Sequence, residues 1–375
     1  MVNIRSKASI KKKKQGTSKA KNSYIQTTMK QHRKNNQYIF FIIMIFLPLY
    51  VFAGYVSYGN DYLNLLRGPG GELYGVSYGL MQNGSENTLM NPAGLQTTST
   101  KPLYLYHSTW FRNEVSASSI GYTFQYNNKP IGLMISRIGV EDIPDSRNAL
   151  LDYGLDGIPG TGDTGEGNGQ LDENEIIDYE SIRFTGIANY SLHLGIPLMN
   201  VGAFQTGITF GLLYADLFET SGFGLTFDIY AQHLGQHIHS LYSIKNLPSA
   251  IMVFNSGSAQ YYAPQINAAW LVPVDIKDFR LLPGITFNMS ITENLDYYMF
   301  HIGSVIAIDL QPVIRIQYKE RIAAGISYRY GDGIHAGIEF SLPLLDISYS
   351  FRPSINNDLG SSHLISLRLS ADIFK

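Results

Sequence analysis

Apolar and polar residues alternate along four successive segments between Arg321 and Ile373. In the first segment every second residue is apolar, namely Ile322, Ala324, Ile326, Tyr328 and Tyr330. Consecutive side chains of a β-strand point to opposite faces, so each segment is predicted to be a strand with one apolar face. The tripeptide Gly331-Asp332-Gly333 is typical of the tight turn between two such strands.

The same pattern recurs upstream, with no helical periodicity between the segments. About 14 to 16 strands are expected in all, because further alternating segments precede the last four. These are residues 103–111, 115–126, 130–140, 182–194, 201–213, 222–233, 242–246, 250–256, 261–271, 279–290, 297–308 and 313–319. A meander this long predicts an all-β fold, either a barrel or a pair of stacked sheets.

Periodicity does not decide which face is buried. In a soluble sandwich the apolar faces pack together, whereas in a membrane barrel they meet lipid and the polar faces line the lumen. The polar face of the last strands carries Arg329, Glu339, Asp346, Arg352 and Arg368, and Asp372 after them. In a barrel these side chains are predicted to form a mixed-charge network in the lumen.

The first 53 residues differ from the rest and read as a secretory signal peptide. They contain 11 Lys and Arg and no acid, and residues 38–52 are almost wholly apolar. A basic region, an apolar region and a small residue before Gly54 form the pattern of a cleaved signal, with Met29 as a candidate start. The alternative is an uncleaved anchor helix, which needs about 20 apolar residues, more than this segment offers.

The composition of the chain without its first 53 residues narrows the possible classes of protein. The remainder keeps 17 of the 28 basic residues and all 30 acidic ones, a net charge of about −13. An acidic exported protein lacks the basic footprint of a nucleic-acid-binding protein. The absence of Cys excludes disulfides, while 26 Tyr, 19 Phe and 36 Gly suit short strands, turns and interfacial aromatic belts.

Several short motifs resemble the PorV/PorQ family of outer-membrane barrels, which are related to the FadL fatty-acid transporters. A Gly-rich run precedes Asn91-Pro92-Ala93-Gly94-Leu95, and the closing strands carry residues 323–329, 334–337, 346–351 and the turn 359–363. The resemblance implies a transmembrane antiparallel β-barrel of about 14 strands over residues 102–375. Residues 54–101 would form a plug, with Asn91, Pro92, Ala93 and Gly94 where it meets the first strand.

An acidic insertion at about residues 141–181 interrupts the strands. Its stretch 168–175 matches the second half of an EF-hand loop, in which carboxylate and carbonyl oxygens surround Ca²⁺. The predicted Ca²⁺ ligands are Asp163, Glu166, Asn168, Gln170, Asp172 and Glu175. The alternative is a solvated acidic loop that holds no ion. Long loops of such barrels lie outside the cell, so the insertion is expected to be extracellular.

Gly75-Val76-Ser77-Tyr78-Gly79 matches a hydrolase motif, but the strand and helix that the motif requires are not predicted around it, so no enzyme is expected. The favoured function is a FadL-like channel for small hydrophobic molecules in the outer membrane of a Gram-negative bacterium, in contact with membrane lipid and lipopolysaccharide. The alternatives are an accessory of type IX secretion that binds secreted proteins, and a soluble secreted calcium-binding β-protein.

Overall fold

The structure is a computed structural model, and it describes residues 65–82, 84–96, 101–292, 295, 298–353 and 360–374. The chain divides into two units, residues 1–55 and 56–375, and only the second contains described residues. The predicted signal peptide therefore lies outside the described part. Within that part, no helix combines the length and the apolar character that a membrane span requires.

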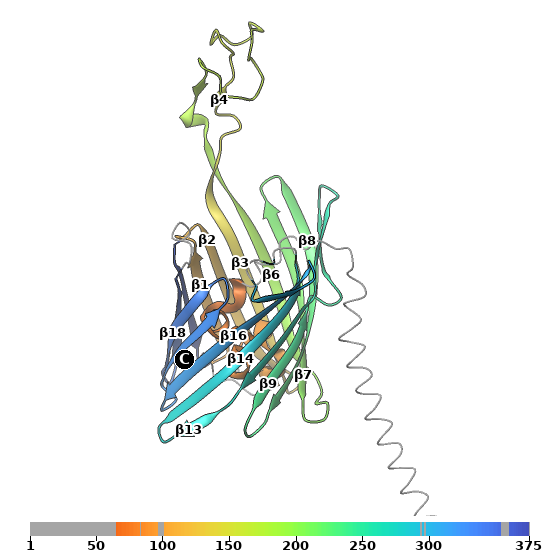
Figure 1. The fold of residues 1–375 in the computed structure, drawn as a ribbon, viewed down its shortest axis with the longest axis vertical. Helices are drawn as coiled ribbons and strands as arrows, with labels where there is room; N and C mark the ends of the chain where they lie inside the picture. The colour runs from red at the N-terminus through yellow and green to blue at the C-terminus, as the bar shows by residue number, and fades with distance from the viewer. Residues whose placement is uncertain are drawn as a thin grey trace, which may run out of the picture. The chain divides into compact units, whose positions relative to one another are not determined.

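One antiparallel sheet forms the wall of a closed barrel (Figure 1). Its strands are β1 (Leu103–Trp110), β2 (Val115–Tyr126), β3 (Lys129–Asp145), β6 (Arg183–Pro197), β7 (Gln205–Leu217), β8 (Thr220–Leu234), β9 (His239–Lys245), β10 (Ala250–Phe254), β11 (Ala259–Tyr262), β12 (Gln265–Leu271), β13 (Val274–Ile276), β14 (Phe279–Ile291), β15 (Phe300–Ile302), β16 (Ile306–Tyr318), β17 (Ile322–Arg329), β18 (Gly333–Ser341), β19 (Leu345–Arg352) and β20 (Ser362–Leu369).

These strands occupy 14 positions around the wall, as the sequence predicts. Strands β9 and β10 share one position against β8, and β11 to β13 share the next. Strand β15 pairs with the part of β16 that β17 does not reach. The ladder between β1 and β20 closes the barrel.

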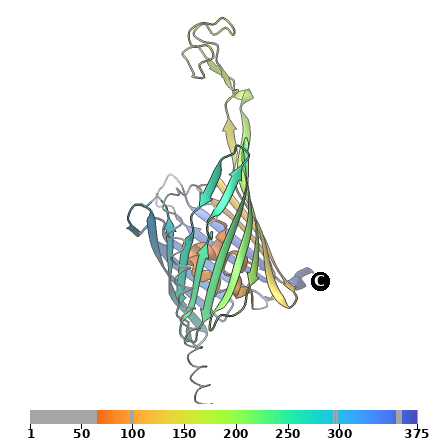
Figure 2. The same cartoon turned by 90° about the vertical axis from the view of Figure 1, so that its right-hand side faces the viewer.

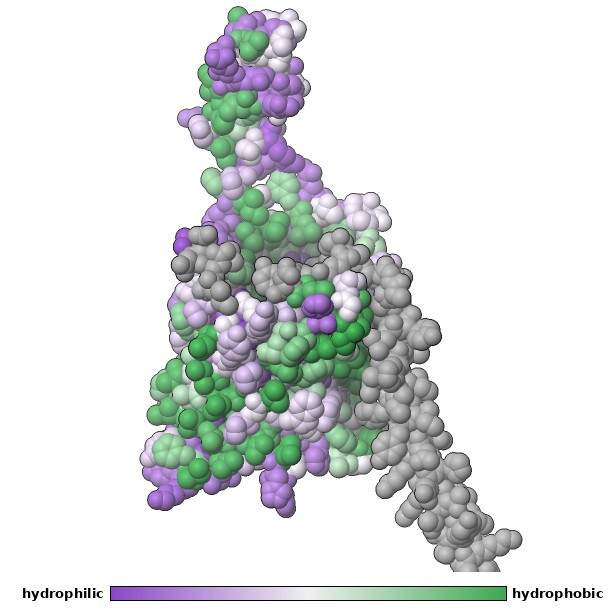
Figure 3. Space-filling view, viewed as in Figure 1, coloured by the Kyte–Doolittle hydropathy of each residue, from purple (hydrophilic) through white to green (hydrophobic). Residues whose placement is uncertain are grey.

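The apolar rows face outward and the polar rows face inward. In β17 the side chain of Ile326 is 47% exposed, whereas the adjacent Ser327 is 4% exposed. Apolar side chains accordingly cover much of the visible wall (Figure 3). The soluble sandwich is therefore wrong, because that fold would bury the apolar rows. A closed barrel whose outer face is apolar is the kind of sheet that a bilayer accepts, so the wall has the form of an outer-membrane barrel.

The two ends of the barrel differ in their connections. At one end the turns are tight, and Asn127 and Asn128 take φ values of 49° and 61° between β2 and β3. At the other end β3 and β6 continue beyond the rim as a long hairpin that carries the acidic insertion (Figures 1 and 2). Short periplasmic turns and long outer loops are the rule in such barrels, so we take the hairpin end as extracellular.

The hairpin also corrects the predicted start of the insertion. Its strands stay paired to Asp145 and Arg183, with a register shift between Val140 and Ile143. Residues at 141–145 are therefore strand and not loop. Beyond them, a small sheet of β4 (Leu150–Leu151) and β5 (Ile176–Ile177) and the turn η4 (Tyr179–Ser181) shape the tip. We call the hairpin beyond the barrel rim, with its tip, the acidic arm.

Residues 65–96 form a plug inside the barrel, drawn in orange in Figure 1. The plug consists of short helical turns, namely η1 (Leu65–Arg67), α3 (Gly68–Tyr74), η2 (Gly75–Leu80), α4 (Asn87–Met90) and η3 (Pro92–Gln96). Inward-facing glycines of the wall make room for it. A Cβ at Gly325 would stand 2.1 Å from the Tyr74 hydroxyl, and one at Gly337 would stand 2.7 Å from Leu73 Cδ2.

The last predicted strand is shorter than expected. Strand β20 ends at Leu369, and Ala371–Phe374 form a helical turn, η5, after the barrel has closed. Asp372 is consequently exposed, and its placement on the lumen face was wrong. The apolar alternation continues through Ile373, but Leu369 already pairs with Leu103 and Leu345, the first residues of β1 and β19, so neither neighbouring strand extends far enough to pair with the residues after it.

The outward rows generate a prediction about stability. Ile326→Arg places a charge on the lipid face in the middle of β17 and should lower the free energy of unfolding in lipid vesicles by about 2–4 kcal/mol. Urea titration followed by heat-modifiable electrophoretic migration measures this change. Tyr179→Arg, at a side chain 75% exposed on the acidic arm, should leave it within about 0.5 kcal/mol. Equal effects of both substitutions would contradict the assignment of the lipid face.

Candidate functional site

Three groups of buried ion pairs join the plug to the wall, and the first centres on Glu72 of α3. Its carboxylate lies 3.3 Å from Arg352, 3.7 Å from Arg329 and 3.5 Å from Nδ1 of His335. Asp332, in the turn between β17 and β18, accepts hydrogen bonds from Arg352 at 2.8 Å and from Arg329 at 3.1 Å. Two guanidinium groups thus bridge two carboxylates, and we call these five residues the Glu72 network.

The second group joins β16, β18 and the plug. Arg315 donates two hydrogen bonds to the carboxylate of Glu339, at 2.9 and 3.0 Å, in the bidentate arrangement typical of strong pairs. The Tyr74 hydroxyl of α3 donates to the same carboxylate at 3.1 Å. Both charged side chains are 7% exposed, so the pair is desolvated and anchors the plug through Tyr74.

The third group lies nearer the periplasmic end. Arg368 of β20 pairs with Glu86 of the plug at 3.2 Å and with Asp346 of β19 at 3.3 Å, and it also donates to Gln82. Lys101, which precedes β1, donates to Asp346 at 2.5 Å. Charged residues of the plug and wall therefore neutralise one another at three levels of the lumen.

All five lumen residues predicted from the sequence face inward within these groups. The sequence alone did not single out their partners Glu72, Glu86, Arg315 and His335. The acidic residues of the plug could have predicted these partners. Glu72 and Glu86 are the only Asp or Glu between residues 62 and 100. A buried acid in a plug requires cations on the surrounding wall.

The predicted junction residues lie in the interior and not beside the first strand. Turn η3 packs against β6, β7, β3 and β8. The side-chain amide of Asn91 donates to the Gly79 carbonyl at 2.9 Å and to Gln232 of β8 at 2.6 Å. Ala93 is fully buried, and a Cβ at Gly207 of β7 would stand 2.4 Å from its nitrogen. Asn91, Pro92, Ala93 and Gly94 thus form the part of the plug that packs against β7.

The predicted calcium residues all lie in the acidic arm. Asn168 donates to Asp172 at 2.8 Å, and Glu175 accepts from the backbone nitrogens of Gly154 and Asp172. Asp163 and Glu166 accept from other backbone nitrogens, while Gln170 contributes its backbone nitrogen to Asn168. Backbone donation from Gly169 and Gly167 keeps the pKa of nearby Asp152 low. Among the described residues, no three acidic groups of the arm lie within 4.8 Å of one another, and the Ca²⁺ site stays a prediction.

A cavity of about 530 Å³ lies at the extracellular end of the lumen, above the plug. One side of it is apolar, formed by Leu65, Phe111, Val115, Ile138, Val140 and Ile187. The other side carries four members of the Glu72 network, all but His335, together with Arg67, Asn288 and Asp309. We call this space the outer cavity. A second space of about 20 Å³, about the room one water molecule needs, lies beside Gly75 and Val76 of the plug and shares four lining residues with the outer cavity.

Comparison with known proteins gives a limited result. No family model and no curated protein sequence matches the chain. Similar solved structures include the P. putida toluene transporter TodX, with 8% identity over 76% of this chain and 93% of that chain, at a TM-score of 0.42. The Ralstonia pickettii toluene transporter TbuX (5% identity, 76% and 93%, TM-score 0.42) and a Pseudomonas aeruginosa FadL homologue (9%, 80% and 95%, TM-score 0.40) are others.

Likenesses of this strength carry no argument about function. The PorV/PorQ resemblance likewise stays a prediction, since no family model supports it. The arguments below therefore use the geometry of this chain.

The Glu72 network generates a prediction about the plug. Glu72→Gln leaves the guanidinium groups of Arg329 and Arg352 with one carboxylate fewer in a buried site, which costs about 3–5 kcal/mol. We expect a lower unfolding temperature and a larger leak conductance in planar bilayers. Glu219→Gln is the matched control, since Glu219 pairs with Arg147 on the surface, where such pairs contribute about 0–1 kcal/mol. Unchanged conductance in Glu72→Gln would show that this network does not hold the plug.

The acidic arm generates a prediction about calcium. Titration of the full-length protein with CaCl₂ in a calorimeter should show binding with a Kd of about 10⁻⁴–10⁻³ M, the range of extracellular sites. The double substitution Asp172→Asn and Glu175→Gln should abolish that heat. Glu114→Gln, in an exposed turn outside the arm, should not change it. A titration without heat at millimolar Ca²⁺ would favour the solvated loop.

Proposed function

We propose that this protein is an outer-membrane channel that admits small, largely apolar molecules. The outer cavity is the observation that carries this proposal. Its volume of about 530 Å³ falls within the range of sites for small organic ligands, and such sites are usually lined by apolar side chains with a few polar groups. An apolar molecule reaching the cell surface would gain by leaving water for the apolar side of this cavity.

The plug would control the passage of molecules through the proposed channel. It fills the lumen below the outer cavity, and it contacts the wall through buried ion pairs and hydrogen bonds as well as through apolar clusters that include Leu73 and Tyr74 of α3. The ion pairs have discrete alternative partners, so a modest shift of α3 would exchange some of them. Passage past the plug then requires loosening of the Glu72 network, which lies directly beside the cavity.

A second candidate function is the binding of secreted proteins at the cell surface. One observation favours it, because the acidic arm exposes large apolar side chains such as Tyr179 at 75% and Phe184 at 68%. Exposed apolar groups on a projecting element are common in protein interfaces. Loss of a surface-bound protein on removal of residues 146–181, with unchanged small-molecule uptake, would favour this second function over the first.

Uptake tests the channel directly. Val115 and Val140 are paired across β2 and β3 and both line the outer cavity. The double substitution to Asn keeps their size but makes the cavity polar, so uptake of labelled toluene by cells expressing the protein should fall about tenfold, the equivalent of 1.4 kcal/mol. Val305→Asn, in an exposed turn, is the control and should leave uptake unchanged. Uptake no faster than in cells without the protein would refute the channel.

A further inference from the structure

Three polar side chains stand in a row on the inner wall of the barrel. Asn267 of β12 is in register with Asn288 of β14, and Asn288 is in register with Asp309 of β16. All three occupy inward positions, and Asn267 and Asp309 are only 1% and 8% exposed. Side chains directly opposite on paired strands lie about 5 Å apart, so the row forms one continuous polar strip. We call these three residues the acceptor row.

Each member of the acceptor row carries a buried oxygen without a donor. The Oδ1 atoms of Asn267, Asn288 and Asp309 have no hydrogen-bond partner among the described residues. The orientation of Asn267 is set by its Nδ2, which donates to Ser243 at 3.3 Å and leaves the oxygen toward the lumen. Buried acceptors are nearly always satisfied in native proteins, so three in one strip call for a donor from outside the chain.

Three cations line the outer cavity, Arg67, Arg329 and Arg352, and the hydrogen bonds of the last two go to residues outside the acceptor row. Arg329 donates to Asp332 and Gln311, and Arg352 donates to Asp332 and Glu72. Arg329 lines the same space as the acceptor row without reaching hydrogen-bond distance of Asp309 Oδ1. A ligand with a carboxylate would therefore meet guanidinium groups that are already paired and oxygens that repel it. A ligand with a hydroxyl or ammonium group would meet acceptors that are available.

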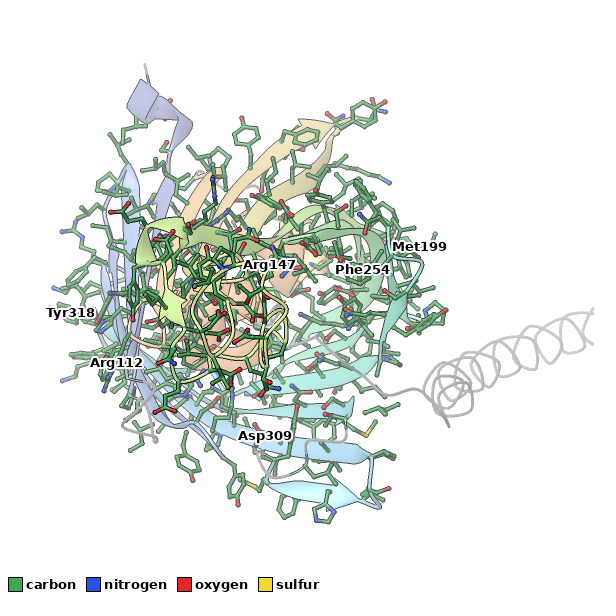
Figure 4. The ribbon with its side chains drawn as sticks, turned by 90° about the horizontal axis from the view of Figure 1, so that it is seen from above. Arg112, Arg147, Met199, Phe254, Asp309 and Tyr318 are labelled. Atoms are coloured by element: carbon green, nitrogen blue, oxygen red, sulfur yellow. The ribbon has the colours of Figure 1, made fainter. Side chains whose placement is uncertain are left out.

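Two members of the acceptor row, Asn288 and Asp309, line the outer cavity. Both residues also line the smaller space beside Gly75 and Val76, so they lie between the two spaces. Figure 4 looks into the barrel from the extracellular end and labels Asp309 on the wall. A molecule whose apolar body occupies the outer cavity would direct its inner end at these two side chains.

We infer that the acceptor row is a specificity site for the hydrogen-bond donor of a small amphipathic ligand, a hydroxyl or an ammonium group attached to an apolar body. The inference rests on the proposed channel function and narrows its substrates. Such molecules should be selected over plain hydrocarbons, which leave the row unsatisfied, and over carboxylates, which add acceptors to it.

Binding to the purified full-length protein in detergent tests this inference, with equilibrium dialysis of four probes that share a phenyl ring. The probes are toluene, benzyl alcohol, benzylammonium and benzoate. Wild type should bind benzyl alcohol or benzylammonium about tenfold more tightly than toluene, and benzoate no more tightly than toluene. A preference for benzyl alcohol alone identifies a hydroxyl site, and one for benzylammonium alone identifies a cation site.

Substitutions inside and outside the acceptor row distinguish its contribution to binding from that of the other cavity residues. The double substitution Asn288→Leu and Asp309→Leu should abolish the preference, and because it makes the cavity more apolar it should not weaken the binding of toluene. Asn189→Leu, which alters a cavity residue outside the row, should preserve the preference. If the double variant does not fold, as heat-modifiable migration reports, Asp309→Asn keeps the shape of the site and should lower the affinity for benzylammonium about tenfold more than that for toluene.

Two results overturn the inference and are distinguishable from failure of the channel. If wild type binds toluene but does not prefer the donor-bearing probes, or if Asn189→Leu removes the preference as fully as the double variant, the row is satisfied by water and selects nothing. If wild type binds none of the four probes, the proposed function fails together with the inference.

Discussion

The hydrocarbon core of a bilayer offers no hydrogen bonds to a polypeptide backbone, and this constraint shapes the whole molecule. A sheet enters such a medium only when it closes, because an open edge would leave a row of unpaired polar groups. Closure here depends on the ladder between β1 and β20. Once the sheet closes, one face of every strand meets lipid and the other encloses a lumen, so alternation along the chain becomes alternation between two environments.

The enclosed lumen imposes a further constraint, because the polar side chains that line it need hydrogen-bond and ion-pair partners. The plug supplies charged partners for them, while its apolar residues pack against apolar residues of the wall. Glu72 and Glu86 come from the plug, while Arg315, Arg329 and Arg368 come from the wall. Buried pairs of this kind contribute little net stability, yet removing one partner is costly, so they specify where the plug sits rather than how firmly the barrel folds. The same arrangement leaves a cavity above the plug and a strip of acceptors beside it.

The sequence predicted the barrel well and the interior only in part. Period-two alternation is a local property, so the placement of Ile326 and Ser327 on opposite faces was readable without a structure, whereas alternation alone did not decide which of the two faces is exposed. The partners of the inward charges were not, because they depend on how an irregular segment folds within the lumen. The extent of the last strand was misread for a related reason, since alternation continues past Leu369 although both neighbouring strands begin opposite that residue. The acceptor row was equally hidden, because it exists only through the register of three strands.

Direct measurement of which face meets lipid would test the orientation of the wall most sharply. The chain contains no Cys, so single cysteines introduced at Ile326, Ser327 and Ile338 provide sites for spin labels in reconstituted vesicles. Labels at Ile326 and Ile338 should be relaxed by lipid-soluble oxygen, and a label at Ser327 should be shielded from it by the plug and wall. A protein that stays dissolved in buffer without detergent, with the labels at Ile326 and Ile338 buried and inaccessible to oxygen, would contradict the account.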